Sequence, residues 1–143
     1  MADEASYDLS IPVVAGDFLH AGEAAGTIKK VLQDLNLPPK LVRRASICAY
    51  EAEMNIIIHA RRGVMGLKVV PEKVTIVAED EGPGIEDIDL AFQEGYSTAP
   101  DEIRELGFGA GMGLPNIKKC ADKLTISSVV GQGTRLEIVI NMI

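Results

Sequence analysis

Residues 66–80, GLKVVPEKVTIVAED, contain two runs rich in valine and isoleucine that are separated by Pro71 and Glu72. β-Branched residues are enriched in strands, and a proline followed by a polar residue between two such runs is typical of a tight turn. The stretch therefore predicts a β-hairpin, whose two strands run antiparallel. Both strands need a covering layer, so the flanking segments decide the fold class.

The flanking segments change their hydrophobic period from two to three or four and back to two. Strict alternation is typical of a half-buried strand, and apolar residues three or four positions apart indicate an amphipathic helix. Prolines open two of the predicted helices, and Gly131-Gln132-Gly133 is the predicted turn of a second hairpin. The predicted elements are a strand at 7–14, helices at about 21–35, 39–60 and 115–122, and hairpin strands at 123–130 and 134–142.

This order predicts an α+β fold, a two-layer α/β sandwich with a mixed, mostly antiparallel sheet. Its helices would cover one face of the sheet and leave the other face to solvent or a partner. The length of 143 residues fits a single domain, 1–143. Between the two hairpins, the Gly-rich and acidic region 81–111 has only short helical signals, and such a run in a compact domain is usually a functional lid or disordered.

Composition limits the partners. The chain is 47% hydrophobic and 24% charged, with a formal net charge of −7, so we expect no nucleic-acid partner, because binding to phosphate needs clustered lysine and arginine. A signal peptide and an apolar run of membrane length are both missing from the sequence, which predicts a cytoplasmic protein without membrane contact. Cys48 and Cys120 form no metal-binding spacing, and His20 and His59 have no second ligand at a suitable interval.

The second predicted helix carries a carboxylate and an amide one turn apart, Glu51 and Asn55. At about 100° per residue both lie along the flank of its apolar stripe. An asparagine oxygen can hold Mg²⁺, and a glutamate can accept a proton from water or a hydroxyl. The alternative is an ordinary polar margin of an amphipathic helix. Glu53 falls on a different face, and we expect it to be solvated.

Asp80 stands at the end of a predicted strand and is followed by Gly82 and Gly84. A carboxylate there can accept a hydrogen bond from an exocyclic amine such as N6 of adenine. The glycines would let the backbone turn sharply and approach a flat ring. The alternative is a plain acidic turn.

A third candidate site is Gly-rich and precedes the helix that begins near Pro115. Free backbone N–H groups and the positive end of the helix dipole would favour an anion there, with Lys118 and Lys119 as possible helpers. The spacing matches neither a Walker A loop nor a Rossmann fingerprint, and a hinge is the alternative. The glycines are Gly107, Gly109, Gly111 and Gly113.

Taken in order, E-x-x-x-N, D-x-G-x-G-I, G-x-G-L and a late G-T resemble the N, G1, G2 and G3 boxes of the GHKL ATPase and kinase superfamily. The four boxes here are Glu51 and Asn55; Asp80, Gly82, Gly84 and Ile85; Gly111, Gly113 and Leu114; and Gly133 and Thr134. The resemblance implies the Bergerat fold, with ATP bound on the helical face of the sheet beneath a lid at about 86–110.

The resemblance also implies roles for the residues. Glu51 would be the catalytic base, Asn55 would coordinate Mg²⁺, and Asp80 would recognise the adenine amine, with Thr134 on the adenine side. The remaining nucleotide-binding positions would be Gly82, Gly84, Ile85, Gly109, Gly111, Met112, Gly113 and Leu114. Arg104 is the one basic residue of the expected lid, so γ-phosphate stabilisation would come from Mg²⁺, backbone groups, Arg104, Lys118 or Lys119.

Within the superfamily, the chain resembles the free-standing anti-sigma factor serine/threonine kinases, including the stress-signalling switch kinases. Residues 109–122, GAGMGLPNIKKCAD, are similar to the Gly-rich loop and helix of the switch kinases. This resemblance implies an ATP- and Mg²⁺-dependent kinase for a STAS-domain antagonist, which could also bind a sigma factor or scaffold and form a homodimer. The alternatives are an ATP-gated binding module without catalysis and a stand-alone ATPase.

Overall fold

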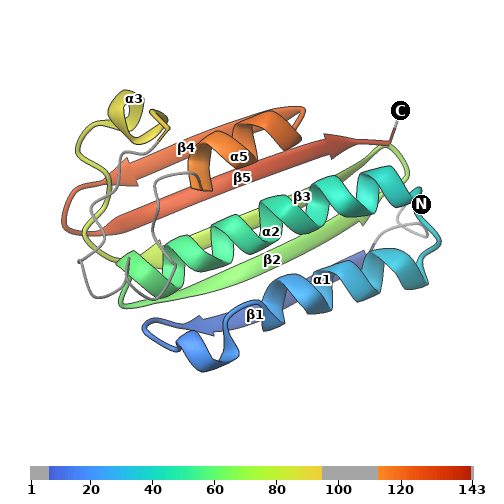
Figure 1. The fold of residues 1–143 in the computed structure, drawn as a ribbon, viewed down its shortest axis with the longest axis horizontal. Helices are drawn as coiled ribbons and strands as arrows, with labels where there is room; N and C mark the ends of the chain where they lie inside the picture. Colours follow the sequence, from blue (N-terminus) through green and yellow to red (C-terminus); the bar gives the residue numbers. More distant parts are fainter. Residues whose placement is uncertain (1–6, 95–112, 143) are drawn as a thin grey trace.

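The computed structural model describes residues 7–94 and 113–142, which form a five-stranded sheet covered on one face by helices (Figure 1). Its strand order is β1-β2-β3-β5-β4, and each neighbouring pair is antiparallel. The strands are β1 Tyr7–Val14, β2 Arg62–Val70, β3 Lys73–Glu81, β4 Lys123–Val129 and β5 Gly133–Asn141. The helices are a 3₁₀ turn Phe18–His20, α1 Glu23–Asp34, α2 Pro39–His59, α3 Ile88–Ala91 and α5 Gly113–Cys120.

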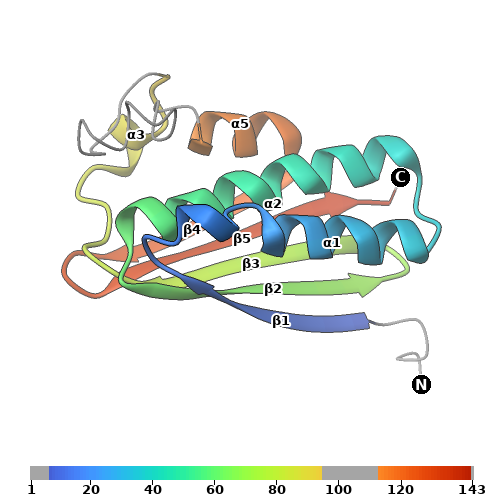
Figure 2. The ribbon, with the colours of Figure 1, turned by 60° about the horizontal axis from the view of Figure 1, so that its bottom comes forward.

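The two-layer arrangement is clear in Figure 2, where α1, α2 and α5 lie on the same side of the sheet. This confirms the predicted sandwich. The predicted hairpins are also present, because Val70 pairs with Lys73 and Val129 pairs with Gly133 across their turns. Two elements differ in their bounds: α5 spans Gly113–Cys120 rather than about 115–122, so that Pro115 lies within its first turn, and β2 begins at Arg62 rather than near residue 66. Its polar start is held by pairing on both sides, with Val14 of β1 and with Glu81 of β3.

The core lies between the sheet and the helices. Alternate residues of the central strands point toward the helices and are buried, as strand geometry requires. The buried strand residues are Met65, Leu67, Val69, Val74, Ile76, Ala78, Leu136, Ile138 and Ile140. On the opposite face, Arg62 pairs with Glu81 at 3.0 Å and Arg135 with Glu79 at 3.7 Å, both among exposed side chains. That face is therefore polar and solvated.

Helix α2 is the central helix of the outer layer, with α1 on one side and α5 on the other (Figure 1). Its predicted apolar stripe is confirmed, since Ala45, Cys48, Ala52 and Ile56 are all buried. In the described ranges, 7–94 and 113–142, no helix is long and apolar enough to cross a membrane.

The prediction that Glu53 is solvated is wrong. Its side chain is 2% exposed, and its carboxylate accepts hydrogen bonds from the backbone N–H groups of Gly22 at 3.1 Å, Ala24 at 3.3 Å and Ala25 at 2.9 Å. The physical reason is that the N-cap of α1 is Gly22, which has no side chain to accept these N–H groups. Glu53 of the neighbouring helix caps α1 instead, and its negative charge lies at the positive end of the α1 dipole.

Candidate active site

Glu51 and Asn55 meet the beginning of α5. A Cβ built on Gly113 would lie 3.4 Å from Asn55 Oδ1 and 3.6 Å from Glu51 Oε1, so the backbone at the α5 N-terminus comes close to both side chains. Asn116, in the first turn region of α5, donates from Nδ2 to Glu51 Oε2 at 2.8 Å. The structure thus brings together Glu51, Asn55 and Gly113, which the sequence analysis placed in one site, and adds Asn116.

Asn116 was missed because its partner is distant in the sequence. The available signal was an amide side chain near the start of a predicted helix that follows a Gly-rich loop. Its hydrogen bond occupies Oε2 of Glu51 and fixes the orientation of the carboxylate. Oε1, the oxygen nearer to Gly113, accepts no hydrogen bond from another described residue.

Asp80 continues the inward-facing row of β3, after Val74, Ile76 and Ala78, and so points toward the helical layer. Its Oδ1 accepts the backbone N–H of Thr134 at 3.2 Å. Burial raises the pKa of Asp80, and the hydrogen bond from Thr134 offsets part of that rise. No hydrogen bond to Oδ2 comes from the described residues, so this oxygen can accept one from a ligand.

The loop after Asp80 is joined to the turn between β4 and β5. Gly82 N–H donates to the Gln132 oxygen at 3.0 Å, and Ile85 N–H donates to Ser128 Oγ at 2.8 Å. Gly84 has a φ of +76°, and a Cβ there would lie 2.6 Å from the Val129 oxygen, so only glycine fits.

The turn itself packs equally closely on Asp80. Gly133 has a φ of +155°, and a Cβ on it would overlap the Asp80 backbone oxygen. Thr134 contributes its backbone N–H to Asp80, while its hydroxyl lies 2.9 Å from Ser128 Oγ. Ser128 was not predicted; the only signal for it was its position opposite Thr134 in the hairpin. Gly84 and Gly133, which belong to two separate boxes, therefore both permit the close contact between the loop after Asp80 and the turn between β4 and β5.

The lysines expected to help with phosphate have other contacts here. Lys118 Nζ lies 5.4 Å from the centre of the Phe92 ring, and Lys119 Nζ lies 2.9 Å from Glu94 Oε2. Both partners belong to the beginning of the expected lid. Gly107, Gly109, Gly111, Met112 and Arg104 lie outside the described residues.

Two more predicted nucleotide-binding residues contribute chiefly to packing. Leu114 is 8% exposed and belongs to the core, and Ile85 packs against the core while partly buried.

The residues fit a nucleotide with its metal. The Asp80 carboxylate has an oxygen available for an amine, and the α5 N-terminus adjoins an amide oxygen and a carboxylate. The described part of the chain has no group of three or more His, Cys, Asp or Glu that could hold a metal ion. Mg²⁺ bound to a nucleotide usually takes one or two protein oxygens and completes its shell with phosphates and water, and the amide oxygen of Asn55 beside Gly113 is of the type it takes. Asn55 would be the protein ligand.

Two hollows adjoin these groups. One, of about 490 Å³, lies at the strand ends, chiefly on the face of the sheet away from the helices, because Arg62, Glu79 and Arg135 line it together with Asp80 and Thr134. The other is a groove of about 920 Å³ between α1 and α2 that reaches Glu51. In the part of the chain that the structure describes, the two hollows share no lining residue.

The fold combines a helix that carries an amide and a carboxylate, an aspartate at the end of a strand, and two turns that require glycine. This combination is that of an ATP-binding domain. A family model, the histidine kinase-like ATPase domain, matches residues 16–140, and the chain belongs to this family. The predicted superfamily and its use of ATP are confirmed.

Among its relatives, the chain is similar to the serine/threonine-protein kinase RsbT of Bacillus subtilis, with 33% identity over 100 residues, 67% of this chain and 69% of the relative. It is also similar to the anti-sigma F factor of Caldanaerobacter subterraneus subsp. tengcongensis, with 37% identity over 89 residues, 59% of each chain. These relatives confirm the predicted resemblance to anti-sigma factor kinases.

The fold has a solved counterpart in the crystal structure of the SiaB–SiaC complex from Pseudomonas aeruginosa. The TM-score is 0.62 with 16% identity, covering 92% of this chain and 88% of that chain. At this identity the likeness shows the fold alone.

Proposed function

We propose that this chain is an ATP- and Mg²⁺-dependent protein serine/threonine kinase of partner-switching regulation, acting on a STAS-domain antagonist in the cytoplasm. The observation that carries the proposal is the carboxylate of Glu51, held by Asn116 at the N-terminus of α5 and beside Asn55. In this proposal residues 1–143 are one kinase domain with a lid at about 86–110. A sigma factor or scaffold would bind as a further partner, and the kinase would act as a homodimer.

The geometry supports a role for each of these residues. Asp80 would bind the adenine amine through Oδ2, while Thr134 N–H keeps Oδ1 in place. Asn55 would hold Mg²⁺ through Oδ1, next to the backbone of Gly113. When bound, the nucleotide and its metal supply the phosphoryl group and the charge that neutralises it.

Glu51 would accept the proton of the acceptor hydroxyl at Oε1. Oε2 accepts the hydrogen bond of Asn116, whereas Oε1 lies near the backbone of Gly113 and has no hydrogen-bond donor among the described residues. A fixed base of this kind contributes about 10²- to 10⁴-fold to rate. Because Asn116 is neutral, its hydrogen bond orients the carboxylate without cancelling its charge.

The test compares Glu51→Gln with Asp80→Asn and with a control, Glu72→Gln, in the exposed turn between β2 and β3. Each purified STAS-domain protein of the source organism is incubated with radiolabelled ATP, and ATP affinity is measured separately by calorimetry. Glu51→Gln should keep ATP affinity and lose transfer by about 10²-fold or more. Asp80→Asn should weaken ATP binding by roughly tenfold, through loss of a charged acceptor.

Each alternative has its own outcome. Equal transfer by Glu51→Gln removes this residue from the base role. Tight ATP binding by the unaltered chain with every STAS-domain protein unlabelled refutes the kinase proposal and favours an ATP-gated binding module. Release of phosphate without any partner identifies a stand-alone ATPase.

A further inference from the structure

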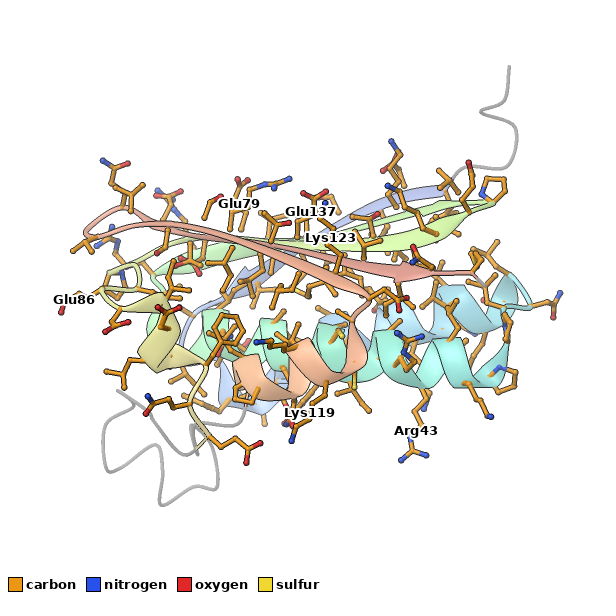
Figure 3. The ribbon with its side chains drawn as sticks, turned by 90° about the horizontal axis from the view of Figure 1, so that it is seen from above. Arg43, Glu79, Glu86, Lys119, Lys123 and Glu137 are labelled. Carbon is orange, nitrogen blue, oxygen red and sulfur yellow. The ribbon has the colours of Figure 1, made fainter. Side chains whose placement is uncertain are left out.

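The groove between α1 and α2 is an accessible surface that meets the proposed nucleotide site at Glu51. Its floor is apolar and includes Val42 and Ile47, and its rim carries Lys29 and Arg43. The lining residues of α2 recur three or four positions apart along one face, from Pro39 to Glu51. Figure 3 shows Arg43 projecting from the helical layer, on the side away from the sheet.

The rim of this groove is cationic. The chain has a net charge of −7, yet Lys29 and Arg43 are exposed on the groove rim and form no ion pair with another described residue. Elsewhere on the described surface, Arg44, Arg62 and Arg135 are paired with carboxylates, whereas Lys68 on β2 and Lys123 on β4 also form no ion pair with another described residue. The one carboxylate in the groove lining is Glu51, at its end, and Asn116 is bound to it. The rim therefore presents positive charge toward solvent.

The groove is also continuous with the proposed catalytic base. Tyr50 and Glu51 both line it, and Glu51 Oε1 faces the N-terminus of α5. A folded acceptor protein cannot bring a serine or threonine hydroxyl to Glu51 without covering the surface next to it. The groove is such a surface, and it combines apolar area with two cations that form no ion pair among the described residues.

We propose that the α1–α2 groove is the docking surface of the acceptor protein, and that it receives an acidic face beside the phosphorylated serine or threonine. This inference rests on the proposed function. An acidic acceptor would be repelled by most of this negatively charged chain, and the cationic rim would orient it so that its hydroxyl meets Glu51. Complementary charge mainly affects how fast two proteins meet and how they are oriented in the complex. The groove would therefore set the KM for the acceptor while leaving the rate of the chemical step unchanged.

The test is the double charge reversal Lys29→Glu/Arg43→Glu. Its matched control is Lys68→Glu/Lys123→Glu, which changes the net charge equally at two exposed positions on β2 and β4. The probe is the STAS-domain protein that accepts phosphate in the transfer assay. The groove variant should raise the KM for that acceptor about tenfold, with kcat and ATP affinity unchanged, and the difference should shrink at high salt. The control should leave the KM within about twofold.

The outcomes separate the two proposals. Transfer with an unchanged KM in the groove variant, or an equal rise in the control, overturns the groove as docking surface and leaves the kinase proposal intact. Absence of transfer to every STAS-domain protein refutes the proposed function, and the groove proposal with it. Circular dichroism and ATP affinity show that the variant is folded, since both reversed side chains are exposed.

Discussion

Replacing Glu53 should destabilise the protein far more than replacing an average surface glutamate. The side chain is 2% exposed and accepts three backbone N–H groups at the start of α1. Hydrogen bonds to a charged acceptor are worth about 1.5–3 kcal/mol each, and they do not add fully. Truncation of Glu53 also leaves the backbone N–H donors at the start of α1 without this acceptor and removes a negative charge from the positive end of the α1 dipole. We expect Glu53→Ala to lower the free energy of unfolding by about 3–5 kcal/mol.

Glu53→Gln keeps the volume and one acceptor oxygen but turns an NH₂ group toward N–H donors, so we expect a loss of about 2 kcal/mol. Urea unfolding followed by circular dichroism measures both variants, and for 143 residues each kcal/mol corresponds to roughly 3 °C in Tm. Glu72→Gln, in an exposed turn, is the control and should change stability by less than about 0.5 kcal/mol. If Glu53→Ala unfolds with the same free energy as the control, the capping role is refuted.

Two other predictions concern backbone fit and pH. Gly133→Ala should destabilise the protein by about 3 kcal/mol or more in the same urea assay, because its Cβ would overlap a carbonyl oxygen of β3. Gly26→Ala is the comparison: this position lies on α1 with open space around it, so the substitution should stabilise the protein by about 0.5–1 kcal/mol. In an NMR titration His20 should titrate above 6.5, since its hydrogen bond with Asp17 raises its pKa, and His59 below 6.5, since burial lowers its pKa. The contribution of His20 to stability is complete below about pH 6.5 and is lost as the pH rises through its folded-state pKa. His59 has the opposite effect: the folded protein keeps it neutral, so the free energy of unfolding decreases as the pH falls below about 6.5. Reversed midpoints would contradict the structure.

Periodicity predicted the elements well because each is strongly patterned over its own length. The boundaries of β1 at Tyr7–Val14 and of α2 at Pro39–His59 agree with the sequence almost to the residue. The start of β2 was missed because Arg62 belongs to the strand only through its pairing partners, which local pattern does not reveal.

The site was predicted less completely, for a physical reason of a different kind. The order of the four boxes placed Glu51, Asn55 and Asp80 in one site, but the partners of these side chains are set by tertiary packing. Asn116 reaches Glu51 because α5 lies beside α2, and no spacing in the sequence encodes that contact. Glu53 was misjudged for the same reason: a helix wheel identifies faces and does not show which face a second helix covers.

Glu51, Glu53 and Asn55 of α2 contact different helices because of the helical rotation between them. At about 100° per residue, Glu51 and Asn55 are 40° apart and both meet α5, whereas Glu53 lies about 160° from each and meets α1. The same short segment thus caps α1 through the carboxylate of Glu53 and presents the carboxylate of Glu51 to the N-terminal part of α5. Because Glu51 and Glu53 share no partner, loss of transfer in Glu51→Gln cannot arise from loss of the α1 cap. Loss of transfer in a Glu53 variant would, by contrast, indicate that the helical layer has lost its fold. Measuring both transfer and the free energy of unfolding for the two variants therefore distinguishes a catalytic base from a residue that stabilises the fold.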